Sequence, residues 1–167
     1  MRGGGEKAAD DLGCGSLVAG VWLRWSGAAG MSLVLDSSVA LAWIYADETT
    51  DAVLRLFDDV RLEGAWVPGL WRWEIANVLQ LNVRRGRHDG NFRDGALASL
   101  AMLPVKVDAE ADRQAWSATL HLAERHGLTV YDAAYLEIAS RREIALATLD
   151  QQLRTAAASD GVQLLGA

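Results

Sequence analysis

The chain has 167 residues, of which 51% are hydrophobic and 23% are charged. This composition supplies enough apolar material for one buried core and excludes an intrinsically disordered chain. The formal net charge of −6 excludes the broadly basic surface of proteins that hold nucleic acid through phosphate contacts alone. It fits either a basic protein partner or nucleic-acid binding that depends on a local basic patch and metal ions.

Residues 1–30 are rich in glycine and keep neither a helical nor a strand period. We expect an ill-ordered extension here, with the folded domain over residues 31–167. The apolar piece at residues 17–25 is too short to span a bilayer, and the acidic start does not fit a signal peptide. An arm that binds a membrane surface or a partner is the alternative. Cys14 is the only cysteine, which excludes an internal disulfide and makes a reducing cytoplasm the simplest setting.

From there on, predicted strands alternate with predicted helices. Short apolar runs predict strands at residues 32–35, 65–67, 104–107, 144–148 and 162–165. Apolar residues at helical spacing predict helices at residues 39–44, 48–59, 70–85, 91–102, 109–126, 132–142 and 150–158. This alternation predicts an α/β domain, in which helices cover both faces of a parallel sheet.

Three aspartates stand where a predicted strand or apolar step gives way to a helix. Asp36 and Asp150 each follow a predicted strand, and Asp132 follows the short apolar step at residues 128–130. In a parallel sheet the carboxyl ends of the strands share one edge, where ligands bind. The sequence therefore predicts that the three carboxylates gather at this edge.

Glu74 is a fourth acid that is predicted to face inward. It lies three residues after Trp71 and four before Val78, beside the apolar stripe of its helix. Two carboxylates about 4 Å apart repel by roughly 4 kcal/mol at an effective dielectric constant of about 20, so a cluster of them must hold protons or bind a cation. Oxygen ligands without histidine or cysteine favour Mg²⁺ or Mn²⁺, ions that activate water for phosphodiester hydrolysis.

Helix capping is the simpler alternative for each aspartate taken alone. Aspartate is a preferred N-cap residue, so Asp36, Asp132 and Asp150 can each be explained by the helix that follows. All three together with an inward Glu74 favour a shared site. The two roles are also compatible, because one carboxylate oxygen can cap a helix while the other binds a metal.

Four segments resemble PIN-domain proteins of the VapC toxin type, in the family's order and at similar separations. They are VLDSSV at residues 34–39, WEIANVL at 73–79, YDAAYL at 131–136 and ATLDQQL at 147–153. The resemblance covers residue 31 to about the C-terminus. It implies a three-layer α/β/α sandwich around a parallel five-stranded sheet. It also implies an Mg²⁺- or Mn²⁺-dependent endoribonuclease toxin that cuts RNA such as tRNA, forms a homodimer and pairs with a cognate antitoxin.

The resemblance also implies which residues do the chemistry. The implied catalytic and metal-binding acids are Asp36, Glu74, Asp132 and Asp150. Thr148 matches a hydroxyl position near the metal, and Ser37 or Ser38 would support it by hydrogen bonding. Many relatives carry a further acid where this chain has Gln152, which leaves fewer anionic ligands for a second ion.

Several other side chains admit two interpretations. The basic clusters are Arg84, Arg85, Arg87 and His88 in one helix end and Arg141 and Arg142 in another. Positive charge suits the C-terminal end of a helix, and contact with RNA phosphate is the alternative. Trp71 and Trp73 are interpreted as core, with an antitoxin groove or a dimer face as the alternative.

Two other functions compete with the nuclease. A non-catalytic module on the same fold would bind a basic peptide or antitoxin through its acidic edge, and Gln152 modestly favours it. A phosphatase of the haloacid dehalogenase type would carry a second aspartate two residues after the first, where this chain has Ser38. We expect no membrane association in any of these cases.

Overall fold

The computed structural model describes residues 33–45 and 49–166. The extension expected at residues 1–30 lies outside these ranges. Five parallel strands form one sheet in the order β3-β2-β1-β4-β5. The strands are Leu33–Leu35 (β1), Ala65–Val67 (β2), Val105–Val107 (β3), Ala145–Ala147 (β4) and Leu164–Leu165 (β5). β1 is central, with Val34 opposite Trp66 of β2 on one side and Leu146 of β4 on the other.

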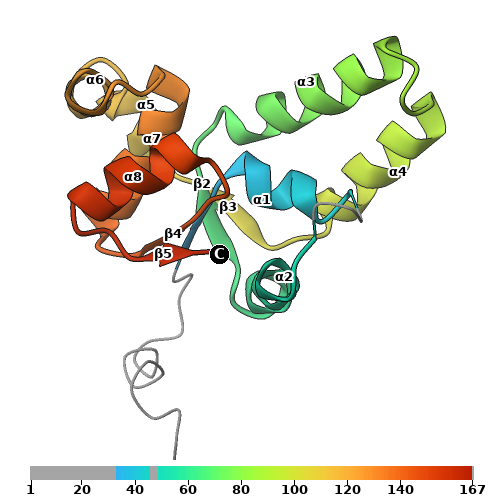
Figure 1. Ribbon diagram of the computed structural model, residues 1–167, viewed down its shortest axis with the longest axis horizontal. Coiled ribbons are helices and arrows are strands. Elements are labelled where there is room, and N and C mark those ends of the chain that lie inside the picture. Colours follow the sequence, from blue (N-terminus) through green and yellow to red (C-terminus); the bar gives the residue numbers. More distant parts are fainter. Residues whose placement is uncertain (1–32, 46–48, 167) are drawn as a thin grey trace, which may run out of the picture.

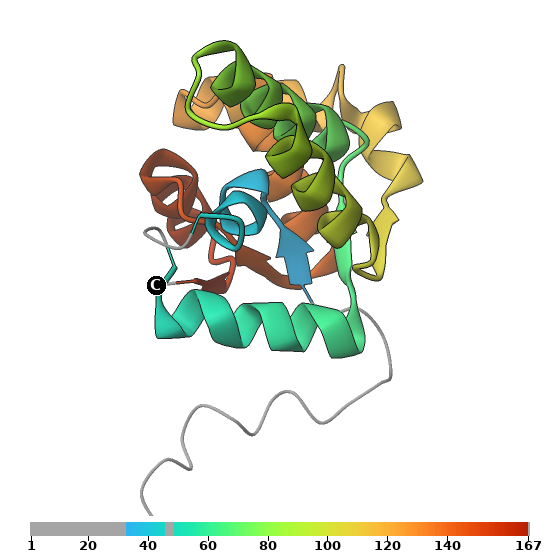
Figure 2. The same ribbon diagram turned by 90° about the vertical axis from the view of Figure 1, so that its right-hand side faces the viewer.

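Helices flank this sheet on both faces, as the sequence predicts (Figures 1 and 2). They are Ser37–Ala42 (α1), Asp51–Glu63 (α2), Trp71–Arg84 (α3), Gly90–Ala101 (α4), Ala109–Gln114 (α5), Ala118–His126 (α6), Val130–Arg142 (α7) and Gln151–Ser159 (α8). α2 lies three residues later than predicted, because Thr50 caps its start through a bond from the Val53 N–H (3.2 Å). Gly64 ends α2 with a φ of 80°, which favours glycine. No helix in the described ranges is long and apolar enough to cross a bilayer.

The single helix predicted over residues 109–126 is wrong. The chain breaks between α5 and α6, where Ser117 has a non-helical backbone and donates to the carbonyl of Gln114 through its N–H (3.0 Å). Both α5 and α6 pack against α7. The buried residues Ala111, Thr119 and Leu122 keep a helical spacing across the break, so this spacing gives no sign of the turn.

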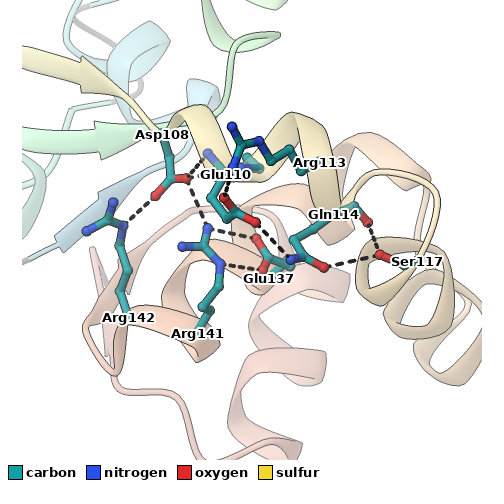
Figure 3. A network of polar contacts seen from close by, with 9 residues as sticks. Asp108, Glu110, Arg113, Gln114, Ser117, Glu137, Arg141 and Arg142 are labelled. Carbon is teal, nitrogen blue, oxygen red and sulfur yellow. Dashed lines mark hydrogen bonds and ion pairs between the residues drawn. The ribbon is translucent and has the colours of Figure 1, made fainter.

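A buried ionic network fastens the C-terminal end of α7 to the end of β3 (Figure 3). Asp108 is fully buried and accepts hydrogen bonds from Arg141 Nη2 (3.0 Å) and from Arg142 Nε. Glu137, which is 3% exposed, accepts from Arg141 Nε (2.6 Å). The Arg142 guanidinium also lies 3.5 Å from the centre of the Trp66 ring. Arg141 and Arg142 are therefore structural, which disfavours the alternative of phosphate contact.

The two tryptophans beside Glu74 have different surroundings. Trp71 is buried in the core, whereas Trp73 is 79% exposed, so the interpretation of Trp73 as core is wrong. Helical geometry explains the difference, because successive turns bring Trp71, Ile75 and Leu79 to the buried side of α3 while Trp73 lies on the opposite side.

Candidate functional site

Asp36 lies at the carboxyl end of the central strand β1. Its backbone N–H continues the ladder to Ala147 O of β4 (3.0 Å), and its side chain is 4% exposed. It occupies the N-cap position of α1, yet its carboxylate makes no capping hydrogen bond. Capping therefore does not explain this acid.

Three hydroxyl groups bind the Asp36 carboxylate instead. Ser38 Oγ (2.5 Å) and Thr148 Oγ1 (2.7 Å) both donate to Oδ2, and Ser37 Oγ lies 3.4 Å from Oδ1. Ser38 Oγ accepts from the N–H of Leu149 (3.0 Å), so its hydrogen is directed at Asp36. These bonds fix the carboxylate against the end of β4 and leave Oδ1 the less engaged oxygen.

Glu74 reaches the same region from the first turn of α3. The buried hydroxyl of Tyr135 in α7 donates to Glu74 Oε2. Burial raises the pKa of Glu74 most, the Tyr135 bond opposes that, and the charges of Asp36 and Asp132 raise it further. The expectation of an inward-facing Glu74 agrees with this half-buried position.

Asp132 does not follow a strand, so the predicted strand-to-helix junction is wrong at this position. Thr129 is the N-cap of α7, and its Oγ1 accepts from the Asp132 N–H (3.1 Å). The same Oγ1 donates to Asp132 Oδ2 (2.6 Å). Asp132 is therefore not the N-cap residue of α7, and one of its carboxylate oxygens accepts a hydrogen bond from Thr129, which is.

Asp150 is the acid for which capping holds. Its Oδ1 accepts from the N–H of Leu153 (2.7 Å) at the start of α8. It is still joined to Asp36, because the Asp150 N–H donates to Thr148 Oγ1 (3.1 Å), which in turn donates to Asp36. Gln152, in the position of the missing acid, donates to the carbonyl of Gly127 (2.6 Å) and ties α8 to the turn before α7.

The effects of charge on pKa indicate that three of the four acids, Asp36, Glu74 and Asp132, lie near one another. Burial raises the pKa of Asp36, the Ser38 and Thr148 hydrogen bonds oppose it, and the charge of Asp132 raises it further. No ion pair among the described residues involves any of the four acids. The cluster thus lacks a cation of its own, and its all-oxygen donors suit a hard divalent ion.

The acids are near one another without forming a finished cage. Within the described ranges, no three aspartate, glutamate, histidine or cysteine side chains are grouped closely enough to hold a metal ion. The hydrogen bonds to Glu74 and Asp132 each engage one oxygen, and a carboxylate has two. Binding an ion would therefore require these carboxylates to move closer to one another, and each has an oxygen that these two bonds do not engage.

Comparison with known proteins identifies the family. The PIN domain family model matches residues 33–159. Ribonuclease VapC3 from Pyrobaculum aerophilum is 33% identical over 127 residues, which cover 74% of this chain and 92% of the relative. The chain belongs to the PIN domain family, among the VapC-type ribonucleases. This confirms the resemblance inferred from the four segments.

Solved structures agree with the PIN fold. PAE2754 from Pyrobaculum aerophilum is 25% identical with a TM-score of 0.59, over 76% of this chain and 86% of the other. FitAcB from Neisseria gonorrhoeae is 15% identical with a TM-score of 0.58, over 80% of this chain and 96% of the other. Both confirm the predicted five-stranded parallel architecture, the second at the level of the fold alone.

The residue that sequence reasoning missed in this PIN domain is Tyr135. Its ring is fully buried and its hydroxyl holds Glu74, while the nearby charges of Glu74 and Asp36 and its burial raise its own pKa. A signal was available, because Tyr135 follows Asp132 by three positions and so lies near it on the same helix surface. Its partner in α3 cannot be read from spacing, since 61 positions separate the two residues.

Proposed function

We propose that this chain is an Mg²⁺- or Mn²⁺-dependent endoribonuclease, the toxin of a toxin–antitoxin pair that acts in the cytoplasm. The observation that carries the proposal is the group formed by Asp36, Glu74 and Asp132. The charge of Asp132 adds to the raised pKa of Asp36, the charges of Asp36 and Asp132 add to the raised pKa of Glu74, and no ion pair with a described cation neutralises these acids. Membership of the PIN family supports the same chemistry.

We assign the roles as follows. Asp36, Glu74, Asp132 and Asp150 are the proposed catalytic and metal-binding residues. A divalent ion held by these residues would supply activation of water and stabilisation of the charge that develops on a phosphodiester. Thr148 and Ser38 orient Asp36 by donating to one of its oxygens, and such support keeps a ligand in position.

We propose RNA, including tRNA, as the substrate, and a cognate antitoxin and a second copy of the chain as partners. The net charge of −6 would speed encounter with a basic antitoxin segment. Similarity to Ribonuclease VapC3 supports the activity on RNA. We further propose that the folded domain spans residues 31–167.

Calorimetric titration with Mn²⁺, comparing wild type with Asp132→Asn, tests the metal site. The substitution removes the charge, but an amide oxygen can still accept from Thr129 Oγ1, and Thr129 still caps α7. We expect wild type to bind Mn²⁺ and the variant to lose most of this binding with unchanged circular dichroism. Equal binding by both proteins would refute Asp132 as a ligand.

A non-catalytic binding module is the second candidate. Two observations favour it: the described acids form no finished metal cage, and Gln152 is used structurally. On that hypothesis a lysine-rich or arginine-rich peptide binds equally well with and without EDTA, and no RNA is cut when Mn²⁺ is added.

Tyr135→Phe tests whether the hydrogen bond from Tyr135 keeps Glu74 ionised for metal binding. The ring remains buried, but the hydrogen bond that lowers the pKa of Glu74 is lost, so this pKa rises further. Since a proton competes with the metal for the carboxylate, we expect the acidic limb of Mn²⁺ binding to move to higher pH. Titrations from pH 5 to pH 8 measure the shift. Unchanged pH dependence would mean that Glu74 does not bind the ion.

A further inference from the structure

The hairpin of α3 and α4 ends in a basic tip, which we define as Arg84, Arg85 and Arg87. Figure 1 shows this end of the hairpin reaching away from the sheet. All three side chains are exposed. None of them forms an ion pair with a described acid. The whole chain has a net charge of −6, but these three guanidinium groups within four residues make this end of the hairpin locally positive.

Helix-dipole compensation does not account for the whole tip. It favours positive charge in the last turn of α3, which covers Arg84 and its neighbour Arg85. Arg87 lies beyond Gly86, whose φ of 68° ends the helix, and the dipole effect falls off within one turn. The one acid in this turn, Asp89, uses its Oδ1 to cap α4 through the Phe92 N–H (2.8 Å).

Stacked aromatic rings pack against the turn that carries the tip. His88, grouped with the arginines from the sequence alone, is one of these rings. His88 is half-buried and stacks on Phe92 with 4.0 Å between ring centres. Tyr45 stacks on His88 at 5.6 Å, and its hydroxyl accepts from Asn82 Nδ2 (2.7 Å). The arginine-bearing turn is therefore anchored both to α4 and to the segment after α1.

α3 sets the spacing between this tip and the acidic site. Glu74 and Arg84 are ten residues apart in one continuous helix, which corresponds to about 15 Å. Arg85 follows Glu74 by eleven positions, or about three turns, so it lies on the same side of α3 as Glu74. At about 3.4 Å per nucleotide along a stacked strand, this distance spans roughly four nucleotides.

We propose that the basic tip binds the phosphate backbone of the RNA about four nucleotides from the cleaved bond. This inference rests on the proposed ribonuclease function. Arginine suits the task, because its planar guanidinium forms paired hydrogen bonds to phosphate oxygens. The tip supplies the local basic patch that an acidic chain needs in order to hold a polyanion.

The test is the salt dependence of binding to a fluorescein-labelled 20-nucleotide single-stranded RNA of mixed sequence. Anisotropy is measured in EDTA, so that the RNA is not cut, from 50 to 300 mM KCl. Each phosphate contact contributes about 0.7 to the slope of log affinity against log salt. The triple variant Arg84→Ala, Arg85→Ala, Arg87→Ala should therefore bind more weakly and lose about 2 from the magnitude of that slope.

A matched variant removes the same charge elsewhere. Arg55, Arg61 and Arg113 are exposed residues of α2 and α5, and replacing all three by alanine should leave the slope nearly unchanged. An equal loss in both triple variants would overturn the proposal, because net charge would then explain it. An unchanged slope in the tip variant would also overturn the proposal. This holds even if the tip variant no longer binds an acidic protein, because the tip would then serve a protein partner and not RNA.

The outcome also separates this inference from the proposed function. Wild type that cuts RNA with Mn²⁺, together with an unaltered slope in the tip variant, overturns only the role of the tip. Wild type that neither binds nor cuts RNA overturns both.

Discussion

Asp36→Asn should abolish metal-dependent RNA cleavage while leaving the fold as stable as wild type or slightly more stable. Ser38 and Thr148 both donate to the same oxygen, Oδ2, which an asparagine carbonyl can replace. The amide group would then occupy the place of Oδ1, beside Ser37 Oγ, which can accept a hydrogen bond. The variant therefore keeps the bonds from Ser38 and Thr148 and loses the charge.

The pH dependence of stability should separate the two proteins. The pKa of Asp36 is raised in the folded state, mainly by burial. Its contribution to stability is then fully present below the unfolded value of 3.8 and is lost as pH rises through the folded value. Metal-free wild type should become more stable relative to Asp36→Asn as pH falls from 7 toward 4.

Urea unfolding in EDTA at several pH values, together with an RNA cleavage assay in Mn²⁺, measures both effects. A variant that cuts RNA at the wild-type rate would remove Asp36 from the mechanism. Loss of cleavage together with clear destabilisation at pH 7 would mean that the charge of Asp36 serves the fold.

Asp108→Ala should destabilise the protein by about 3 to 5 kcal/mol, the range for breaking a buried ion pair by removing one partner. Asp108 is fully buried and receives both Arg141 and Arg142. Its Oδ1 also caps α5 through the N–H groups of Glu110 (2.9 Å) and Ala111 (3.0 Å). Alanine would leave the guanidinium of Arg142 without its acidic partner, leave Arg141 paired with Glu137 alone, and uncap α5.

Glu110→Gln is the matched control, since it breaks an exposed ion pair to Arg113 (3.3 Å) in the same network. We expect it to cost less than about 1 kcal/mol. Burial alone would raise the pKa of Asp108, but the bonds from Arg142 and Arg141 outweigh it and lower that pKa. The difference between wild type and Asp108→Ala should therefore persist above pH 4 and shrink at lower pH. Equal unfolding midpoints for the two variants would contradict the buried network.

Local pattern in the sequence was sufficient to predict the sheet and most helices. The apolar runs that became β1 and β4 are buried on both faces and that of β2 nearly so, and their continuous hydrophobicity identified them. The break between α5 and α6 was not predictable, because it follows from how both helices pack against α7. The contact of Tyr135 with Glu74 was missed for the same reason, since distant parts of the chain create it.

The sequence predicted the acids as one set but did not predict their local roles, and their shared site stays a prediction. Asp36, Asp132 and Asp150 look alike in sequence, each near the start of a helix. In the structure, one is held by hydroxyl groups, one is held by its own N-cap threonine, and one caps a helix. Local sequence cannot distinguish these cases, because the partners of Asp36 include Thr148, 112 positions away.

That separation governs when the acidic edge can form during folding. The central strand β1 is made first, but its neighbour β4 and Thr148 come near the end of the chain. Closing so long a loop costs conformational entropy before any contact repays it, so such pairings form late in folding. A chain that ends before β4 has Asp36 but not the threonine that orients it. The polypeptide must extend past Thr148 and Asp150 before all four acids and the threonine that orients Asp36 can come together.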